Sequence, residues 1–202
     1  MEYYLSIILF CLVTSITPGP NNIMLMSSGL NHGVLKTVPH ISGIIIGFPL
    51  MVAALGFGLG TIFLNYPVIH QVIKIAGVSY LLFLAWKIAN TTRANAGKHL
   101  REPMTFMQAA AFQWLNPKAW VIAIGAIAAF TTVGNFEVQV VIIVFTYLFV
   151  GTFSMGLWLL MGASLQRILH SQKQLQVFNV VMAILLVLSI VPIVVMEFGG
   201  GA

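Results

Sequence analysis

Apolar residues fill six long stretches of the 202-residue chain, and polar residues gather in the short segments between them. Each stretch is close to the roughly 20 residues that an α-helix needs to cross a bilayer. The expected spans cover residues 3–28, 38–63, 68–90, 106–130, 138–163 and 175–197. The pattern predicts an all-α integral membrane protein with six transmembrane helices. We expect the first helix to be retained, because it lacks the preceding positive charge of a signal peptide.

A run of prolines, glycine and asparagines interrupts the first predicted span. Its residues are Thr17, Pro18, Gly19, Pro20, Asn21 and Asn22. Proline lacks a backbone donor and clashes with the preceding turn, so a helix cannot pass through this run unbroken. A broken helix persists in hydrocarbon only where protein or a wet cavity satisfies its free peptide groups. The run therefore indicates an interior site. The alternative is a purely structural kink whose asparagines satisfy the local backbone.

A second proline interrupts the fourth predicted span, in the sequence Asn116-Pro117-Lys118. Each half of the chain holds three helices, so the second half enters the membrane from the opposite side. The chain is expected to form one transporter domain over 1–202, built as a 3+3 inverted repeat with proline-broken helices 1 and 4. The first repeat covers 1–90, a cytoplasmic linker 91–104 and the second repeat 105–202. Interrupted helices at matching positions of inverted halves indicate a binding site.

Composition supports a membrane protein and excludes several kinds of site. Hydrophobic residues make up 59% of the chain and charged residues only 6%, whereas a soluble domain carries about a quarter of its residues as charges. The sequence shows no cofactor or metal motif, and its basic residues form no run suited to nucleic acid. The aspartates and the zinc motif of membrane proteases are missing, so we expect no enzyme. The alternative to a transporter is a membrane scaffold or channel-like helical bundle without active transport.

Charge also predicts the orientation. Seven of the nine Lys and Arg residues lie in three alternate connections, 29–37, 87–104 and 164–174. The other connections and both ends carry glutamates but no Lys or Arg. By the positive-inside rule, the three basic connections are cytoplasmic and both termini are periplasmic.

Three motifs resemble those of the lysine exporter (LysE/RhtB) family of bacterial amino-acid exporters. They are the run from Thr17 to Asn22 with the glycines after it, the stretch from Ala76 to Lys87, and Leu115-Asn116-Pro117-Lys118-Ala119. The resemblance covers essentially the whole chain. It implies a multi-pass protein of the bacterial inner membrane that exports amino acids or close derivatives, driven by the proton gradient as an antiporter.

The two interruptions suggest how a substrate binds. A helix N-terminus exposed at a break suits a carboxylate, and the freed carbonyls suit an ammonium group. Substrate binding is therefore expected at 17–22 and at Asn116, Pro117 and Lys118. Lys118, the only charge near the membrane centre, could bind a carboxylate, belong to a proton path, or have a structural role in which it snorkels or pairs with backbone carbonyls at the Pro117 break. His40 is a second candidate for the proton path; its alternative is a solvated interfacial histidine.

Further residues bear on substrate and partners. No acidic residue falls inside a predicted span, so nothing there would offset the side-chain charge of lysine or arginine, and a neutral amino acid is favoured. The expected partners are this amino acid, protons and membrane lipid. The glycines of the second span, among them Gly43 and Gly47, also suit a homodimer. Tyr147 could hydrogen-bond across the bundle or line a cavity, and Trp120 and Trp158 lie deep enough to line one.

Overall fold

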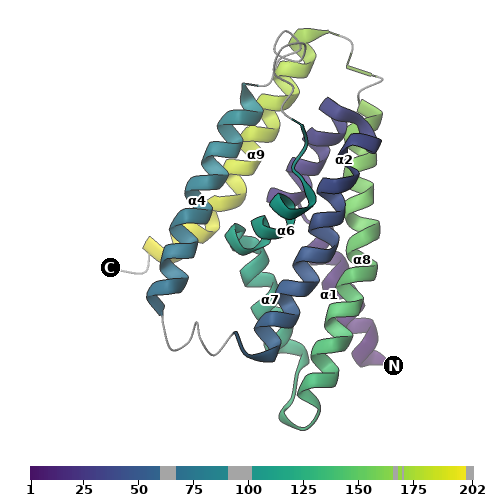
Figure 1. Ribbon diagram of the computed structural model, residues 1–202, viewed down its shortest axis with the longest axis vertical. Coiled ribbons are helices and arrows are strands. Elements are labelled where there is room, and N and C mark those ends of the chain that lie inside the picture. The colour runs from purple at the N-terminus through teal and green to yellow at the C-terminus, as the bar shows by residue number, and fades with distance from the viewer. Residues whose placement is uncertain (60–66, 91–101, 166–167, 170, 199–202) are drawn as a thin grey trace.

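The computed structural model describes residues 1–59, 67–90, 102–165, 168–169 and 171–198, and within these ranges it is all-α, as predicted. Its elements are α1 (Glu2–Ile16), α2 (Pro20–Ala54), the π-helical turn η1 (Leu55–Leu59), α4 (Pro67–Ala89), α6 (Phe106–Leu115), α7 (Pro117–Phe130), the 3-10 turn η2 (Val133–Asn135), α8 (Phe136–Leu165) and α9 (Gln172–Phe198). Along the long axis of the molecule, α2 lies beside α8 and α4 beside α9 (Figure 1). Most of the expected linker 91–104 falls outside the described residues.

Several helices have the length and apolarity of membrane spans. Among the described residues, the stretches long and apolar enough to cross a membrane are Pro20–Gly58, Val133–Leu165 and Gln172–Ser189. Shorter apolar helices cover Glu2–Ile16, Ile75–Ala89 and Pro117–Phe130. On α8, Phe145, Phe149 and Phe153 are 64%, 69% and 65% exposed at four-residue spacing. Such an outward apolar stripe along one helix face suits a hydrocarbon surrounding.

The helix α2 folds back on itself at Gly33. Gly33 has φ 79° and ψ 174°, a conformation that a residue with a β-carbon rarely adopts. The hydroxyl oxygens of Ser28 and Thr37 lie 3.0 Å apart, whereas nine residues of straight helix would separate them by about 13 Å. α2 therefore supplies two arms that pack against each other, one before Gly33 and one after it. The connection expected at 29–37 contains the turn between these arms.

Prolines set the ends of the helices in the middle of the bundle. The residue before a proline is disfavoured in the helical region, and Thr17, Gly19 and Asn116 are all extended. α1 consequently ends at Ile16, just before the extended Thr17, and α2 begins at Pro20. The helices α6 and α7 are separated in the same way, and α7 begins at Pro117.

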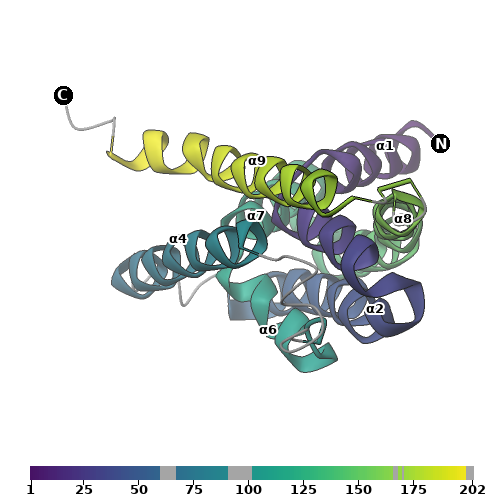
Figure 2. The ribbon, with the colours of Figure 1, turned by 90° about the horizontal axis from the view of Figure 1, so that it is seen from above.

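Three clusters of buried side chains hold the helices together. The largest joins α1, the end of α2, α7 and α8. A second joins the start of α2 to α4, α6 and α9, and a third lies between the arms of α2, α6 and α8. Seen from above, α4 and α9 form one side of the molecule, and α1, α2 and α8 form the other (Figure 2).

The glycines that suggested a homodimer are used inside the chain. A β-carbon at Gly43 would collide with the carbonyl of Phe106, and one at Gly47 would lie 2.7 Å from the Cα of Ala110. Both glycines thus allow the second arm of α2 to approach α6 closely. Gly43 and Gly47 thus serve packing within the chain, and the homodimer stays a prediction.

Candidate functional site

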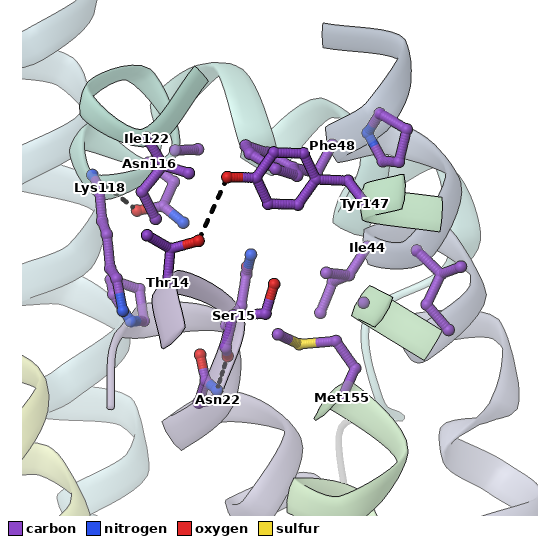
Figure 3. Close-up of a pocket in the computed structure, with 16 residues that line it drawn as sticks. Thr14, Ser15, Asn22, Ile44, Phe48, Asn116, Lys118, Ile122, Tyr147 and Met155 are labelled. Atoms are coloured by element: carbon purple, nitrogen blue, oxygen red, sulfur yellow. Dashed lines mark hydrogen bonds between the residues drawn. The ribbon is translucent and has the colours of Figure 1, made fainter. Parts of the chain in front are cut away.

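A small cavity lies where α1 ends, α2 and α7 begin, and the second arm of α2 meets the middle of α8 (Figure 3). Its volume is about 50 Å³, and one water molecule needs roughly 10–15 Å³. Its polar lining consists of Thr14, Ser15, Asn21, Asn22, Asn116, Lys118 and Tyr147. Its apolar lining includes Ile44, Phe48, Ile122 and Met155. The middle of an otherwise apolar bundle therefore offers space and hydrogen-bonding groups for water or a small polar solute.

Side chains of α2 and α8 donate hydrogen bonds to carbonyls freed at the end of α1. Asn22 Nδ2, from α2, donates to the carbonyl of Ser15 at 2.8 Å. Trp158 Nε1, from α8, donates to the carbonyl of Ile16 at 3.2 Å. A carbonyl without a partner is costly in hydrocarbon, so these bonds stabilise an interruption that would otherwise destabilise the helix. Trp158, expected to line a cavity, instead bonds to this helix end.

Lys118 joins the two proline-containing segments directly. Its side chain runs from the start of α7 toward the end of α1 (Figure 3), where Nζ donates to the carbonyl of Thr17 at 2.7 Å and of Pro18 at 3.3 Å. Its backbone N–H donates to Asn116 Oδ1 at 3.2 Å, so Asn116 caps α7. The sequence left open three roles for Lys118, one of them a pairing with carbonyls at the Pro117 break. The structure pairs it with carbonyls, but with those of the other break.

An amide pair ties the start of α2 to the end of α6. Asn21 Nδ2 donates to Gln113 Oε1 at 2.8 Å, and Gln113 Nε2 donates back to Asn21 Oδ1 at 3.2 Å. Gln113 is fully buried and also donates to the carbonyl of Ala109 at 2.9 Å. Sequence reasoning missed Gln113. The available signal was a glutamine within an apolar span, one turn before Pro117.

The structure brings most of the predicted substrate-binding residues together. Those that line the cavity are Pro20, Asn21, Asn22, Asn116 and Lys118. Thr17 and Pro18 contribute the carbonyls that accept from Lys118. Gly19 lies against the Lys118 stem, since a β-carbon there would be 2.7 Å from Lys118 Cδ. Pro117 is buried at the first position of α7.

Aromatic and hydroxyl groups complete the cavity. The hydroxyls of Thr14 and Tyr147 lie 3.2 Å apart (Figure 3), and the ring of Phe48 packs edge-on against Tyr147 with centroids 4.9 Å apart. Tyr147 thus both lines the cavity and bonds across the bundle, as the sequence suggested. Trp120 does not line it; its Nε1 donates to the carbonyl of Trp114 at 2.8 Å within the largest cluster.

His40 is buried in the second arm of α2, with 2% of its surface exposed. The alternative of a solvated interfacial histidine is therefore wrong. Neither ring nitrogen has a hydrogen-bond partner among the described residues. His40 does not line the cavity, but Ile44, one helical turn further along α2, does. In the same described part of the chain, no group of three or more His, Cys, Asp or Glu side chains could hold a metal ion.

Comparison with known proteins identifies the family of the chain. The model of the family described as LysE type translocator matches residues 12–195. The cysteine/O-acetylserine efflux protein of Escherichia coli (strain K12) is 32% identical over 183 residues, which cover 88% of this chain and 90% of that protein. The proteins of the same name from Shigella sonnei (strain Ss046) and Shigella flexneri serotype 5b (strain 8401) match equally well. No solved structure matches the chain. The chain belongs to the LysE type translocator family and is a membrane transporter, not an enzyme.

Proposed function

We propose that the protein exports small neutral amino acids or close derivatives across the bacterial inner membrane, driven by protons. Membership of the LysE family supports amino-acid export. The relatives are named for efflux of cysteine and O-acetylserine, whose side chains carry no formal charge at neutral pH when cysteine is a thiol. No glutamate of the described residues lines the cavity. This lining suits a neutral substrate, because it offers no carboxylate to a second ammonium group.

The observation that carries the proposal is the meeting of opposite helix ends at one cavity with a polar lining. The end of α1 presents carbonyls, and the start of α2 has no side-chain cap on its first N–H groups. A helix C-terminus favours a cation and a helix N-terminus favours an anion. An amino acid in the cavity would direct its ammonium toward the end of α1, at Thr14 and Ser15, and its carboxylate toward the start of α2, at Asn21 and Asn22. The cavity must widen to admit it.

Transport then follows from the arrangement of the two halves. In our proposal, residues 1–90 and 105–202 form inverted repeats of three spans each, and the halves rock about the cavity to give alternating access. The interruptions at Pro18 and Pro117 are the matching pair in the two repeats. The excess of Lys and Arg in the alternate connections favours cytoplasmic placement of these connections and periplasmic termini.

Lys118 and His40 are the proposed groups for proton coupling. Lys118 is the charged side chain in the cavity lining. His40 lies outside the cavity lining. We include it as a proton-carrying group because its two ring nitrogens are buried without hydrogen-bond partners in the described structure. A buried polar group without a partner is costly, and such groups in membrane proteins commonly serve ion or proton movement.

The proposal predicts which compounds leave cells that produce the protein. Cells are loaded with labelled amino acids, and loss of label is followed with and without an uncoupler. We expect faster loss of one or a few small neutral amino acids and none of lysine or arginine, with the gain abolished by the uncoupler. Asn116→Ala should reduce the gain at least tenfold, because it removes both a cavity amide and the cap of α7.

Asn135→Ala provides the matched control. Asn135 lies in the exposed turn η2 and does not line the cavity, so its loss should leave efflux unchanged. Both variants must be present in the membrane at equal amounts. Loss of every amino acid at the rate of cells without the protein would remove the proposed function. Equal efflux by Asn116→Ala and Asn135→Ala would remove the cavity as its site.

A further inference from the structure

A hollow larger than the cavity lies where the two arms of α2 join, beside the start of α6. Its volume is about 340 Å³, against about 50 Å³ for the cavity. Pockets for small molecules commonly have volumes of about 300–1,000 Å³, so the hollow admits a small amino acid without widening. Its lining comes from the residues around the Gly33 turn and from the segment that leads into α6, and includes His32, Leu35, Lys36, Pro39, Glu102 and Met104.

Side chains of opposite charge line this hollow. Lys36 comes from the second arm of α2, and Glu102 from the segment before α6. In the described structure no ion pair joins the two, so both charges are open to a ligand. A lining with cations alone would suit a simple anion such as phosphate, whereas a lining with both signs is complementary to a zwitterion. The hollow therefore suits a molecule that carries an ammonium group and a carboxylate.

The start of α6 is capped by its own side chains. Thr105 Oγ1 accepts from the backbone N–H of Gln108 at 3.2 Å, and the backbone N–H of Thr105 donates to Gln108 Oε1 at 3.1 Å. This capping box occupies donors that a helix N-terminus would otherwise offer to an anion. The group in the hollow for a carboxylate is consequently the Lys36 ammonium.

One apolar cluster separates the hollow from the cavity. Met104 lines the hollow and packs against the cluster of Leu25, Ile44, Ala109 and Met155. Ile44 and Met155 of the same cluster line the cavity. A ligand held in the hollow is thus separated from the cavity by a single cluster of side chains.

His40 lies between the two spaces along the second arm of α2. Pro39 lines the hollow and Ile44 lines the cavity, and five residues of helix span about 7.5 Å. His40 is only 2% exposed, and neither of its ring nitrogens has a hydrogen-bond partner among the described residues. A buried polar group without a partner is costly, and in membrane proteins such groups mark the paths of polar solutes and ions. Its position supports a polar route between the hollow and the cavity.

We propose that this hollow is a further binding site, which captures a zwitterionic amino acid before it reaches the cavity. The Lys36 ammonium receives the carboxylate of the ligand, and the Glu102 carboxylate receives its ammonium. Because these groups are common to all α-amino acids, the hollow recognises the class and leaves selection among side chains to the cavity. Its role in first capture rests on the proposed function, including the cytoplasmic placement of the connections that form it. An exposed charge pair contributes about 0–1 kcal/mol, so the site binds weakly and exchanges its ligand quickly.

The test is protection of a cysteine placed in the hollow. Leu35 lines the hollow and is 88% exposed, and the native Cys11 is fully buried. Alkylation of Leu35→Cys by a small thiol reagent is timed in detergent at fixed ionic strength, with and without saturating L-serine. We expect L-serine to slow alkylation several-fold. Serine methyl ester, which has only the ammonium, and N-acetylserine, which has only the carboxylate, should not slow it at the same concentration. Val133→Cys, in the exposed turn η2, should be alkylated at one rate throughout.

Charge removal supplies the second arm of the test. In the Leu35→Cys protein, Lys36→Gln or Glu102→Gln should abolish protection by L-serine. The matched controls Lys173→Gln and Glu137→Gln remove exposed charges that do not line the hollow, and protection should remain.

The inference is overturned if L-serine gives no protection, if either single-charge compound protects equally, or if protection survives both Lys36→Gln and Glu102→Gln. Protection by phosphoethanolamine but not by L-serine would assign the hollow to a lipid headgroup and would also overturn it. The measurement involves no transport. The expected protection without amino-acid efflux would therefore reject the proposed function and retain the site, and efflux without protection would do the opposite.

Discussion

Net efflux by Lys118→Met is expected to fall at least tenfold, while exchange of external for internal amino acid continues. Lys118 Nζ donates to the carbonyls of Thr17 and Pro18 and so links the end of α1 to the start of α7. In the proposed alternating-access cycle, the empty carrier relies on this link when it returns. Loss of a hydrogen bond to a charged group costs about 1.5–3 kcal/mol, and each 1.4 kcal/mol slows a step about tenfold. The return of the empty carrier should therefore become rate-limiting.

The two modes are separated in proteoliposomes. Net efflux is measured with no amino acid on the opposite side, and exchange is measured with unlabelled amino acid there, so that the carrier never returns empty. Lys173→Met is the matched control and should retain both modes. Equal loss of net efflux and exchange would mean that Lys118 is needed by the loaded carrier. Unchanged net efflux would show that Lys118 is not needed at all.

Gly77→Ala is expected to destabilise the protein by about 1–3 kcal/mol, the usual effect of overpacking. Gly77 lies on α4, and a β-carbon there would overlap the carbonyl of Leu115, the last residue of α6. Backbone cannot rotate away as a side chain can, so α4 must move from the end of α6. For a chain of 150–250 residues, this corresponds to a Tm lower by about 2–12 °C.

Gly125→Ala is the matched control for this substitution. Gly125 lies on α7, and a β-carbon there meets nothing within 4 Å. Thermal unfolding in detergent should show a large decrease for Gly77→Ala and little change for Gly125→Ala. The same Tm for both variants would contradict the close approach of α4 to α6.

Much of the fold follows from local chemistry in the sequence. Long apolar stretches require helices in a membrane, because only helices satisfy their own backbone there. The extended residues Thr17 and Asn116 each precede a proline, and this restriction acts between neighbours along the chain. Gly33 could be assigned to a connection, since polar residues surround it. The sequence could not predict that the chain stays helical on both sides of Gly33. This arrangement depends on the packing of the two arms of α2, which brings the hydroxyls of Ser28 and Thr37 together.

The partners of the site residues were harder to predict. Asparagine and lysine at a break indicate polar chemistry, but spacing along the chain does not say which carbonyl Lys118 reaches across the bundle. Gln113 is distant from Asn21 in sequence and pairs with it only because α6 and α2 pack together. His40 follows Pro39 at the expected edge of a span, and its burial reflects tertiary contacts of α2.

The most direct test of the central claim, that substrate binds in the cavity between the two interruptions, is protection of an introduced cysteine. Ile122 lines the cavity, and the native Cys11 is fully buried. Alkylation of Ile122→Cys by a small thiol reagent is timed with and without the exported amino acid. The parent protein and Val133→Cys, in the exposed turn η2, are the controls. We expect the amino acid to slow alkylation of Ile122→Cys several-fold and to leave Val133→Cys unchanged. Alkylation of Ile122→Cys at the same rate with saturating amino acid would contradict the account.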